Sequence, residues 1–248
     1  MKSSKATLRL CLLCEKPNQL RNSHIIPKLF RRAIAKRLGR IPVWNNLGEP
    51  GKVAQDLPKH YLCCDECEQL MSAAEGKAAA MFQRGSPLPF RYGPWMMLFA
   101  AGLAAKAVGV HLRNLRASHA QDGIPPEEFS LLKVALAQWR KVILKAATPE
   151  KHELHLLNFD VTAFPGLNAA CGHTLLWNDE FKAILIYLNG VLIVAVVTAA
   201  PGTLARATRI TMNGATVTAA CRALHPAIAA ALQQLSDNYR AEQALEQA

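Results

Sequence analysis

The sequence predicts an α+β fold, in which a short cysteine-rich unit precedes helices, an antiparallel β-sheet and a C-terminal helix. Two Cys-x-x-Cys pairs lie within the first 67 residues. Apolar stretches at helical spacing follow between about 95 and 146, and from about 154 the pattern changes to strands separated by Asn-Gly turns. Because 51% of the 248 residues are hydrophobic, the chain can bury a sizeable core.

The two cysteine pairs predict a structural zinc site. The pairs Cys11/Cys14 and Cys64/Cys67 each place two sulfurs on one tight turn, and four thiolates match the tetrahedral shell of zinc. A redox motif would need only one such pair, next to a βαβ pattern. Cys63 competes with Cys64, but the spacing favours Cys64. Seven cysteines, an odd number, are poor evidence for a disulfide framework and indicate a reducing cytoplasm.

The first third of the chain is predicted to form one domain, residues 1–92. An extended stretch reaches residue 24, and Ser23 with Pro27 is typical of a helix N-terminus, which predicts a helix over 27–38. Residues 39–60 contain Gly, Pro and Asn, so we expect a loop with at most a weak hairpin. The second cysteine pair opens a predicted helix over 65–83.

The second predicted domain, residues 93–248, begins with two helices. Residues 95–115 are largely apolar. A buried helix is favoured over a transmembrane one, because Lys106 lies at mid-span and Gly102 and Gly109 weaken the signal. The second helix, over 125–145, has acidic residues in its first turn and basic ones in its last, as the helix dipole prefers.

The rest of this domain has the pattern of strands. Asn189-Gly190 joins two apolar runs and suits a type I′ turn, so this hairpin is expected to be central and covered on both faces. Asn213-Gly214 predicts a second, half-exposed hairpin. The sheet should pack against the helices of 95–146. The predicted strands are 154–159, 173–177, 181–188, 191–198, 208–212 and 215–219, followed by a helix over 226–243.

The net charge of +11 is concentrated in the first domain. Residues 1–92 hold 16 Lys and Arg against 7 Asp and Glu, a net +9, whereas 93–248 hold 13 against 11, a net +2. A localised basic field favours a polyanion, and we expect nucleic acid, DNA rather than RNA. A membrane surface is disfavoured, since no basic amphipathic helix stands apart from the cysteine motif. A homodimer is compatible with the sequence.

His24 is the candidate for acid–base chemistry. It lies ten residues after Cys14, at the end of the extended stretch and beside basic residues. A neutral imidazole there can take a proton from water that attacks a phosphodiester, while a divalent metal stabilises the phosphate oxygens. The alternatives are a structural histidine or a zinc ligand that replaces one cysteine.

The paired cysteines, the Ser-His-Ile-Ile-Pro motif at 23–27 and the Leu-Cys-Cys-Asp-Glu-Cys-Glu run at 62–68 resemble the zinc-stapled branch of the HNH nuclease family. The resemblance covers about residues 11–84. It implies a treble-clef, or ββα-metal, core with a structural zinc on the four cysteines. It also implies that His24 is the general base and that Asn45 or Asn46 helps to position it.

The chain departs from that family where the catalytic metal would bind. Ser23 stands where an acidic residue is common, Glu68 follows Cys67 where Asn is usual, and the helix after Cys67 has no histidine. Glu68 and Glu75 lie two turns apart, hence on one helix face, and carboxylates are good ligands of Mg²⁺ or Mn²⁺. The alternative for both is a solvated face near the positive end of the helix dipole.

The basic helix predicted over 27–38 is a candidate phosphate-binding surface. Such contacts set the position of a nucleic acid and not its sequence. A solvated helix face is the alternative. The candidate side chains are Lys28, Arg31, Arg32, Lys36 and Arg37.

These observations lead to two main hypotheses. The first is a metal-dependent HNH-like nuclease, with a defence or mobile-element context by analogy. The second is a non-catalytic, zinc-dependent DNA- or RNA-binding protein whose C-terminal domain is a sensor or interaction module. A third is a structural zinc protein whose basic face meets an acidic protein. The sequence holds no phosphate-cradling Gly loop, no Gly-x-Ser-x-Gly elbow and no dinucleotide fingerprint.

Overall fold

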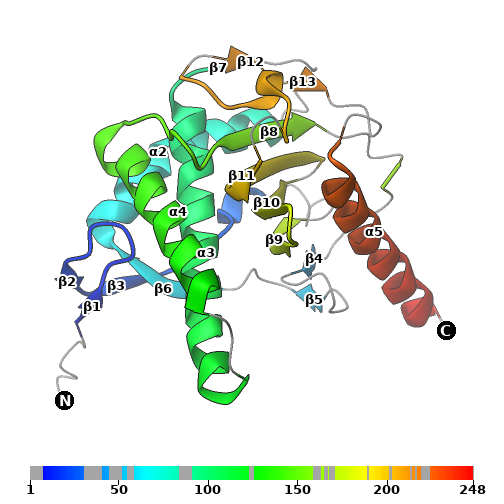
Figure 1. Ribbon diagram of the computed structural model, residues 1–248, viewed down its shortest axis with the longest axis horizontal. Coiled ribbons are helices and arrows are strands. Elements are labelled where there is room, and N and C mark those ends of the chain that lie inside the picture. The colour runs from blue at the N-terminus through cyan, green and yellow to red at the C-terminus, as the bar shows by residue number, and fades with distance from the viewer. Residues whose placement is uncertain are drawn as a thin grey trace.

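The fold is α+β, as predicted, with helices on both faces of a central sheet (Figure 1). The computed structural model describes residues 8–30, 41–44, 52–54, 59–83, 91–122, 126–158, 163–164, 167, 171–188, 190–200, 203–212, 214–215, 217–218 and 224–247.

The N-terminal part has a ββα arrangement. Strands β1 (Arg9–Leu10) and β2 (Pro17–Asn18) pair on either side of the first cysteine turn. Strand β3 (Leu20–His24) pairs antiparallel with β6 (Lys59–Cys64), and helix α2 (Asp65–Gln83) follows β6 directly. We call β3, β6 and α2 the ββα unit. Residues 28–30 are helical, and the rest of the helix predicted over 27–38 lies outside the described residues.

Two long helices pack between the ββα unit and the sheet. Helix α3 (Trp95–Asp122) extends seven residues beyond its predicted end, and α4 (Pro126–Lys145) ends where predicted. Within α3, Trp95–Asn114 is long and apolar enough to cross a membrane by length and composition alone, but 89% of this stretch is buried inside the protein. A Cβ on Gly109 would lie 2.7 Å from a Leu12 methyl, so glycine permits this close approach of α3 to the first cysteine turn.

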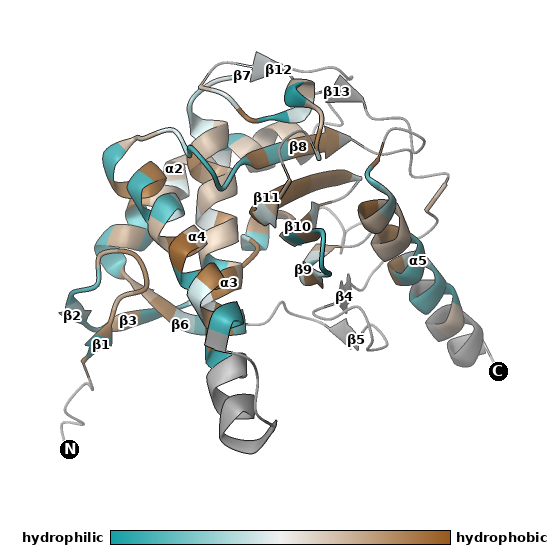
Figure 2. Cartoon of the chain, in the orientation of Figure 1, coloured by the Kyte–Doolittle hydropathy of each residue, from teal (hydrophilic) through white to brown (hydrophobic). Residues whose placement is uncertain are grey.

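The central sheet has seven strands in the order β13-β8-β11-β10-β9-β4-β5. Its middle strands are antiparallel, and Gly190, with φ of 86°, makes the predicted turn between β10 and β11. One face packs on α3 and α4 and the other on α5 (Pro226–Gln247), so the apolar hairpin is covered on both sides (Figure 2). The middle strands are β8 (Leu154–Asn158), β9 (Cys171–Trp177), β10 (Phe181–Leu188) and β11 (Val191–Ala199).

Strand pairing crosses the predicted domain boundary at residue 92. Strands β4 (Ile41–Trp44) and β5 (Lys52–Ala54) come from the stretch predicted as a loop, and β4 pairs parallel with β9. Strand β7 (Arg91–Tyr92) pairs with β12 (Gly214–Ala215). A single apolar core also extends from the N-terminal cysteines to the sheet. These pairings join residues far apart in sequence, which local periodicity does not reveal.

The prediction of a second hairpin, over 208–219, is wrong. Residues 206–208 form a short 3-10 helix, η2 (Arg206–Thr208), and β12 and β13 (Val217–Thr218) pair with β7 and β8 and not with a strand over 208–212. The Thr208 hydroxyl donates to the Ala205 carbonyl oxygen, at 2.8 Å, which supports the turn. Tertiary pairing and this local hydrogen bond outweigh the alternating Thr pattern.

Candidate metal centre

Four cysteines converge where the first turn meets the ββα unit. Cys11 and Cys14 come from the turn before β2, Cys64 ends β6 and Cys67 lies in the first turn of α2. Their sulfurs lie within 4.8 Å of one another, and none of the four forms a disulfide. Cys63 is not part of the cluster. The predicted metal ligands therefore come together, and the site can hold a metal ion such as zinc.

The cluster has the dimensions of a tetrahedral thiolate site. Zinc–sulfur bonds of about 2.3 Å place neighbouring sulfurs roughly 3.8 Å apart in a tetrahedron. The Cys14 and Cys64 sulfurs are 3.9 Å apart. The backbone N–H of Cys64 donates to the Cys11 sulfur at 3.3 Å, the kind of contact that holds a ligand sulfur in place.

The four thiols experience different local fields. The pKa of Cys11 is lowered to about 3, because the Cys63 thiol and backbone N–H groups donate to its sulfur and outweigh the effect of burial. Burial raises the pKa of Cys64 and of Cys67. A bound dication favours the thiolate of every ligand and so removes this difference.

Glu68 and Glu75 face a lysine that comes from another helix. Lys106 of α3 places its Nζ 2.9 Å from Glu68 Oε2 and 3.2 Å from Glu75 Oε1, and its side chain is only 3% exposed. Burial alone would lower the pKa of Lys106, but attraction by Glu75 and Glu68 more than offsets this and raises it above its ordinary value. The two carboxylates share one face of α2, as predicted, and the ammonium group lies between them.

Ser23 completes this cluster, and His24 follows it at the end of β3. The Ser23 hydroxyl donates to Glu68 Oε1 at 2.7 Å. Successive side chains of a strand point to opposite faces, so the half-buried His24 projects from the other side of β3. Glu68 is thus bound by Ser23 and Lys106 through its two oxygens. Lys106 is the residue that sequence reasoning missed; a lone lysine in an apolar helix was the available signal, because a buried ammonium requires carboxylate partners.

The other predicted site residues fall into two groups. Lys28 is exposed at the start of the helical residues 28–30, which follow β3 after a short turn, and a phosphate can reach it there. His60 is half-buried on β6, outside the cysteine cluster, and burial followed by repulsion from Arg113 lowers its pKa. The predicted residues Arg31, Arg32, Lys36, Arg37, Asn45 and Asn46 lie outside the described part of the chain.

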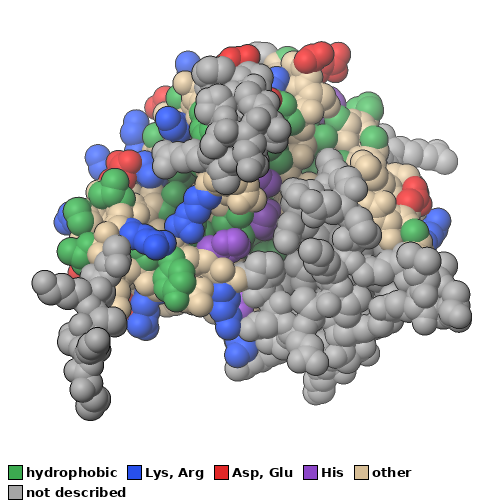
Figure 3. Space-filling view, turned by 90° about the horizontal axis from the view of Figure 1, so that it is seen from below, with side chains coloured by type: hydrophobic (Ala, Val, Ile, Leu, Met, Phe, Trp, Pro, Cys, Tyr) green, Lys and Arg blue, Asp and Glu red, His purple; other side chains and the backbone are tan. Residues whose placement is uncertain are grey.

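A basic, partly apolar surface adjoins the cysteine cluster. We call this surface the knuckle face. Its basic side chains are Arg9 of β1, Arg113 of α3, and Lys133 and Arg140 of α4, and its exposed apolar side chains are Leu10 and Tyr61. Arg113 donates to the backbone carbonyl oxygen of Tyr61, whose side chain is 49% exposed. Burial, and secondarily the positive charge of Arg9, lower the pKa of Arg113. Figure 3 shows Lys and Arg side chains interspersed with hydrophobic ones on the described left part of this side of the molecule.

The knuckle face is hollowed. A cavity of about 370 Å³ lies between the first cysteine turn and the helices α3 and α4. Arg140 bounds it and is fixed there, since its Nε donates to the Leu12 carbonyl oxygen at 2.6 Å and its guanidinium pairs with Glu15. Among the described residues, Arg9, Arg113 and Lys133 of this face have no acidic partner within salt-bridge distance. The lining comprises Leu10, Cys11, Leu12, Glu15, Leu62, Gly109, Leu112, Arg113, Lys133, Leu136 and Arg140.

Comparisons of the chain with protein-family models, with curated proteins and with solved structures found no match.

Proposed function

We propose that this protein binds nucleic acid, DNA in the first instance, through its zinc-held N-terminal part, without cleaving it. The unpaired basic side chains of the knuckle face carry the proposal: among the described residues, Arg9, Arg113 and Lys133 have no acidic partner within salt-bridge distance, and Arg113 and Lys133 line its cavity. Unpaired positive charges on one face raise the local potential, and a bound polyanion relieves it. The exposed Tyr61 ring beside them offers a surface on which a base can stack.

The Lys106 ion pairs favour binding over metal-dependent cleavage. A divalent metal at Glu68 and Glu75 would have to displace an ammonium group that both carboxylates already contact. Removal of one partner from such a pair leaves an uncompensated charge and is strongly unfavourable. The described residues offer no second carboxylate or histidine cluster that could hold a metal instead.

The test is the binding of a short fluorescein-labelled DNA duplex to the zinc-loaded full-length protein, followed by fluorescence anisotropy at several salt concentrations. We expect log Kd to depend on log salt, and Arg113→Gln to weaken binding and reduce the slope by about 0.9. Arg240→Gln, on the exposed surface of α5, is the matched control and should bind as the wild type does. Salt-independent binding, or equal loss in both variants, would refute the proposal. The same titration with RNA decides the preferred polymer.

The HNH-like nuclease is the second candidate, and the ββα arrangement favours it. His24 ends β3 and α2 follows β6, in the order that the resemblance implies. In that reaction His24 would accept the proton of the attacking water, and Mg²⁺ or Mn²⁺ would stabilise the phosphate oxygens. Plasmid nicking with either ion decides between the candidates. Nicking by the wild type that His24→Ala abolishes establishes the nuclease; DNA binding without nicking supports the first proposal.

A further inference from the structure

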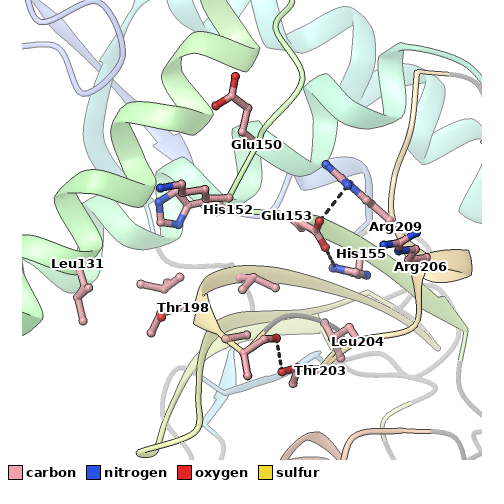
Figure 4. Close-up of a pocket in the computed structure, with 15 residues that line it drawn as sticks. Leu131, Glu150, His152, Glu153, His155, Thr198, Thr203, Leu204, Arg206 and Arg209 are labelled. Atoms are coloured by element: carbon pink, nitrogen blue, oxygen red, sulfur yellow. Dashed lines mark hydrogen bonds and ion pairs between the residues drawn. The ribbon is translucent and has the colours of Figure 1, made fainter.

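A second cavity lies far from the cysteines, between the α4–β8 connection, the end of β11 and η2. Its volume is about 580 Å³, which is in the range of pockets that enclose a small metabolite. Figure 4 shows the walls: His152 on one side, Glu153, His155 and the two arginines on the other, and Thr198, Thr203 and Leu204 below.

One wall of this cavity is a satisfied network of charges and hydrogen bonds. Glu153 Oε1 pairs with Arg209 at 2.9 Å and its Oε2 with His155 Nε2 at 3.1 Å, so both carboxylate oxygens are engaged. His155 Nδ1 lies 2.9 Å from the Thr208 hydroxyl, and Arg209 also donates to the Pro149 carbonyl oxygen at 3.0 Å. Glu153 is therefore neutralised within the protein and does not repel an anion that enters the cavity.

Arg206 takes no part in this network. It lines the cavity from η2, is exposed, and has no acidic partner within salt-bridge distance among the described residues. The remaining acid of the lining, Glu150, points away from Arg206 in Figure 4. Arg206 thus lines the cavity with an uncompensated charge and five donors, which suits a phosphate or a carboxylate.

His152 lines the opposite end of the cavity. Its Nδ1 is buried and has no hydrogen-bond partner within the described structure, so this atom does not face the space that a ligand would fill. The Trp139 indole fixes this residue by donating to the His152 carbonyl oxygen at 3.0 Å. Leu131 and Leu204 provide apolar surface between the two ends.

We infer that this cavity binds a small phosphorylated metabolite, with its phosphate on Arg206 and its apolar part against Leu131 and Leu204. A nucleoside monophosphate combines a phosphate with a flat base that can lie on apolar side chains, and AMP is the probe. The inference is independent of nucleic-acid binding, because none of the residues that line this cavity belongs to the knuckle face.

Isothermal titration of the zinc-loaded full-length protein with AMP tests the inference. We expect saturable binding that Arg206→Gln weakens about tenfold to a hundredfold, as the loss of charge-assisted hydrogen bonds does. Arg240→Gln is the control for a general loss of positive charge and should leave the affinity unchanged. Adenosine should bind more weakly than AMP, and inorganic phosphate should compete with AMP.

Two results would overturn the inference. One is the absence of saturable AMP binding at ligand concentrations of roughly 1 mM and above. The other is AMP binding that Arg206→Gln and Arg240→Gln affect equally, which would assign the nucleotide to the basic surface in general. Because Arg206 is exposed, its substitution should leave thermal unfolding unchanged, and circular dichroism verifies that the variant is folded.

Discussion

Replacing Lys106 with methionine should destabilise the protein and create a binding site for divalent metal. Methionine keeps the length and the apolar stem of lysine but removes the ammonium group that lies 2.9 Å from Glu68 and 3.2 Å from Glu75. The side chains of the two acids are 18% and 20% exposed, so water replaces only part of the lost attraction. Breaking such a buried pair from one side costs about 3–5 kcal/mol, and this partial exposure favours the lower end.

A set of variants separates the lost charge from lost packing. Adding Glu68→Gln and Glu75→Gln to Lys106→Met removes the two unpaired charges, so the triple variant should regain most of the stability that Lys106→Met loses. Urea unfolding of the zinc-loaded proteins gives the free energies. A triple variant as unstable as Lys106→Met would show that the lysine acts through packing alone.

Lys106→Met also tests whether the lysine prevents a second metal ion from binding at Glu68 and Glu75. With Lys106→Met, Ser23, Glu68 and Glu75 present oxygens and two negative charges to one point, as Mn²⁺ prefers. Saturating Mn²⁺ should raise the unfolding free energy of Lys106→Met and not of the wild type. Equal stabilisation of both, or a loss of less than about 1 kcal/mol in Lys106→Met, would refute the reasoning.

Three further predictions follow from contacts elsewhere in the fold. Gly109→Ala should cost about 1–3 kcal/mol in urea unfolding, because the new Cβ meets Leu12 methyls at 2.7 and 2.9 Å; Gly76→Ala in α2, whose Cβ meets nothing within 4 Å, should instead stabilise by up to about 1 kcal/mol. Trp139→Phe should lose at least about 0.5–1.5 kcal/mol, because it removes the hydrogen bond to the His152 carbonyl oxygen and leaves space in a fully buried site, and unchanged stability would contradict that role. Burial lowers the pKa of His111 to about 4 and of His173 to about 3, so below pH 6.5 the unfolded chain binds more protons than the folded one. Stability should therefore fall as the pH falls from 6.5 toward 4, by at most about 1.4 kcal/mol per pH unit for each histidine. Urea unfolding at pH 7 and pH 5 should show a smaller loss for His173→Leu than for the wild type.

Local patterns in the sequence predicted most of the helices and the central hairpin. The helix after Cys67 has its predicted bounds, and Asn-Gly at 189–190 marks the turn between β10 and β11, since a positive φ is favourable for glycine. The cysteine spacing likewise predicted the four clustered sulfurs, because a Cys-x-x-Cys turn fixes two sulfurs by itself.

Features that depend on distant residues were not predictable in this way. Strand β4 pairs with β9, which comes more than 120 residues later, and β12 pairs with β7 instead of with residues 208–212. The partnership of Lys106 with Glu68 joins residues 38 positions apart on two helices. The lone lysine was visible in the sequence, but the identity of its partners follows only from how α2 packs on α3.

The metal content of the purified protein tests the account most directly. Elemental analysis of the wild type, Cys64→Ser and Cys171→Ser should find one zinc ion per chain in the wild type and in Cys171→Ser, whose thiol is buried away from the cluster, and a loss of zinc in Cys64→Ser. A wild type without zinc, or the same zinc content in all three proteins, would contradict the claim that the four cysteines hold the N-terminal part together around a metal ion.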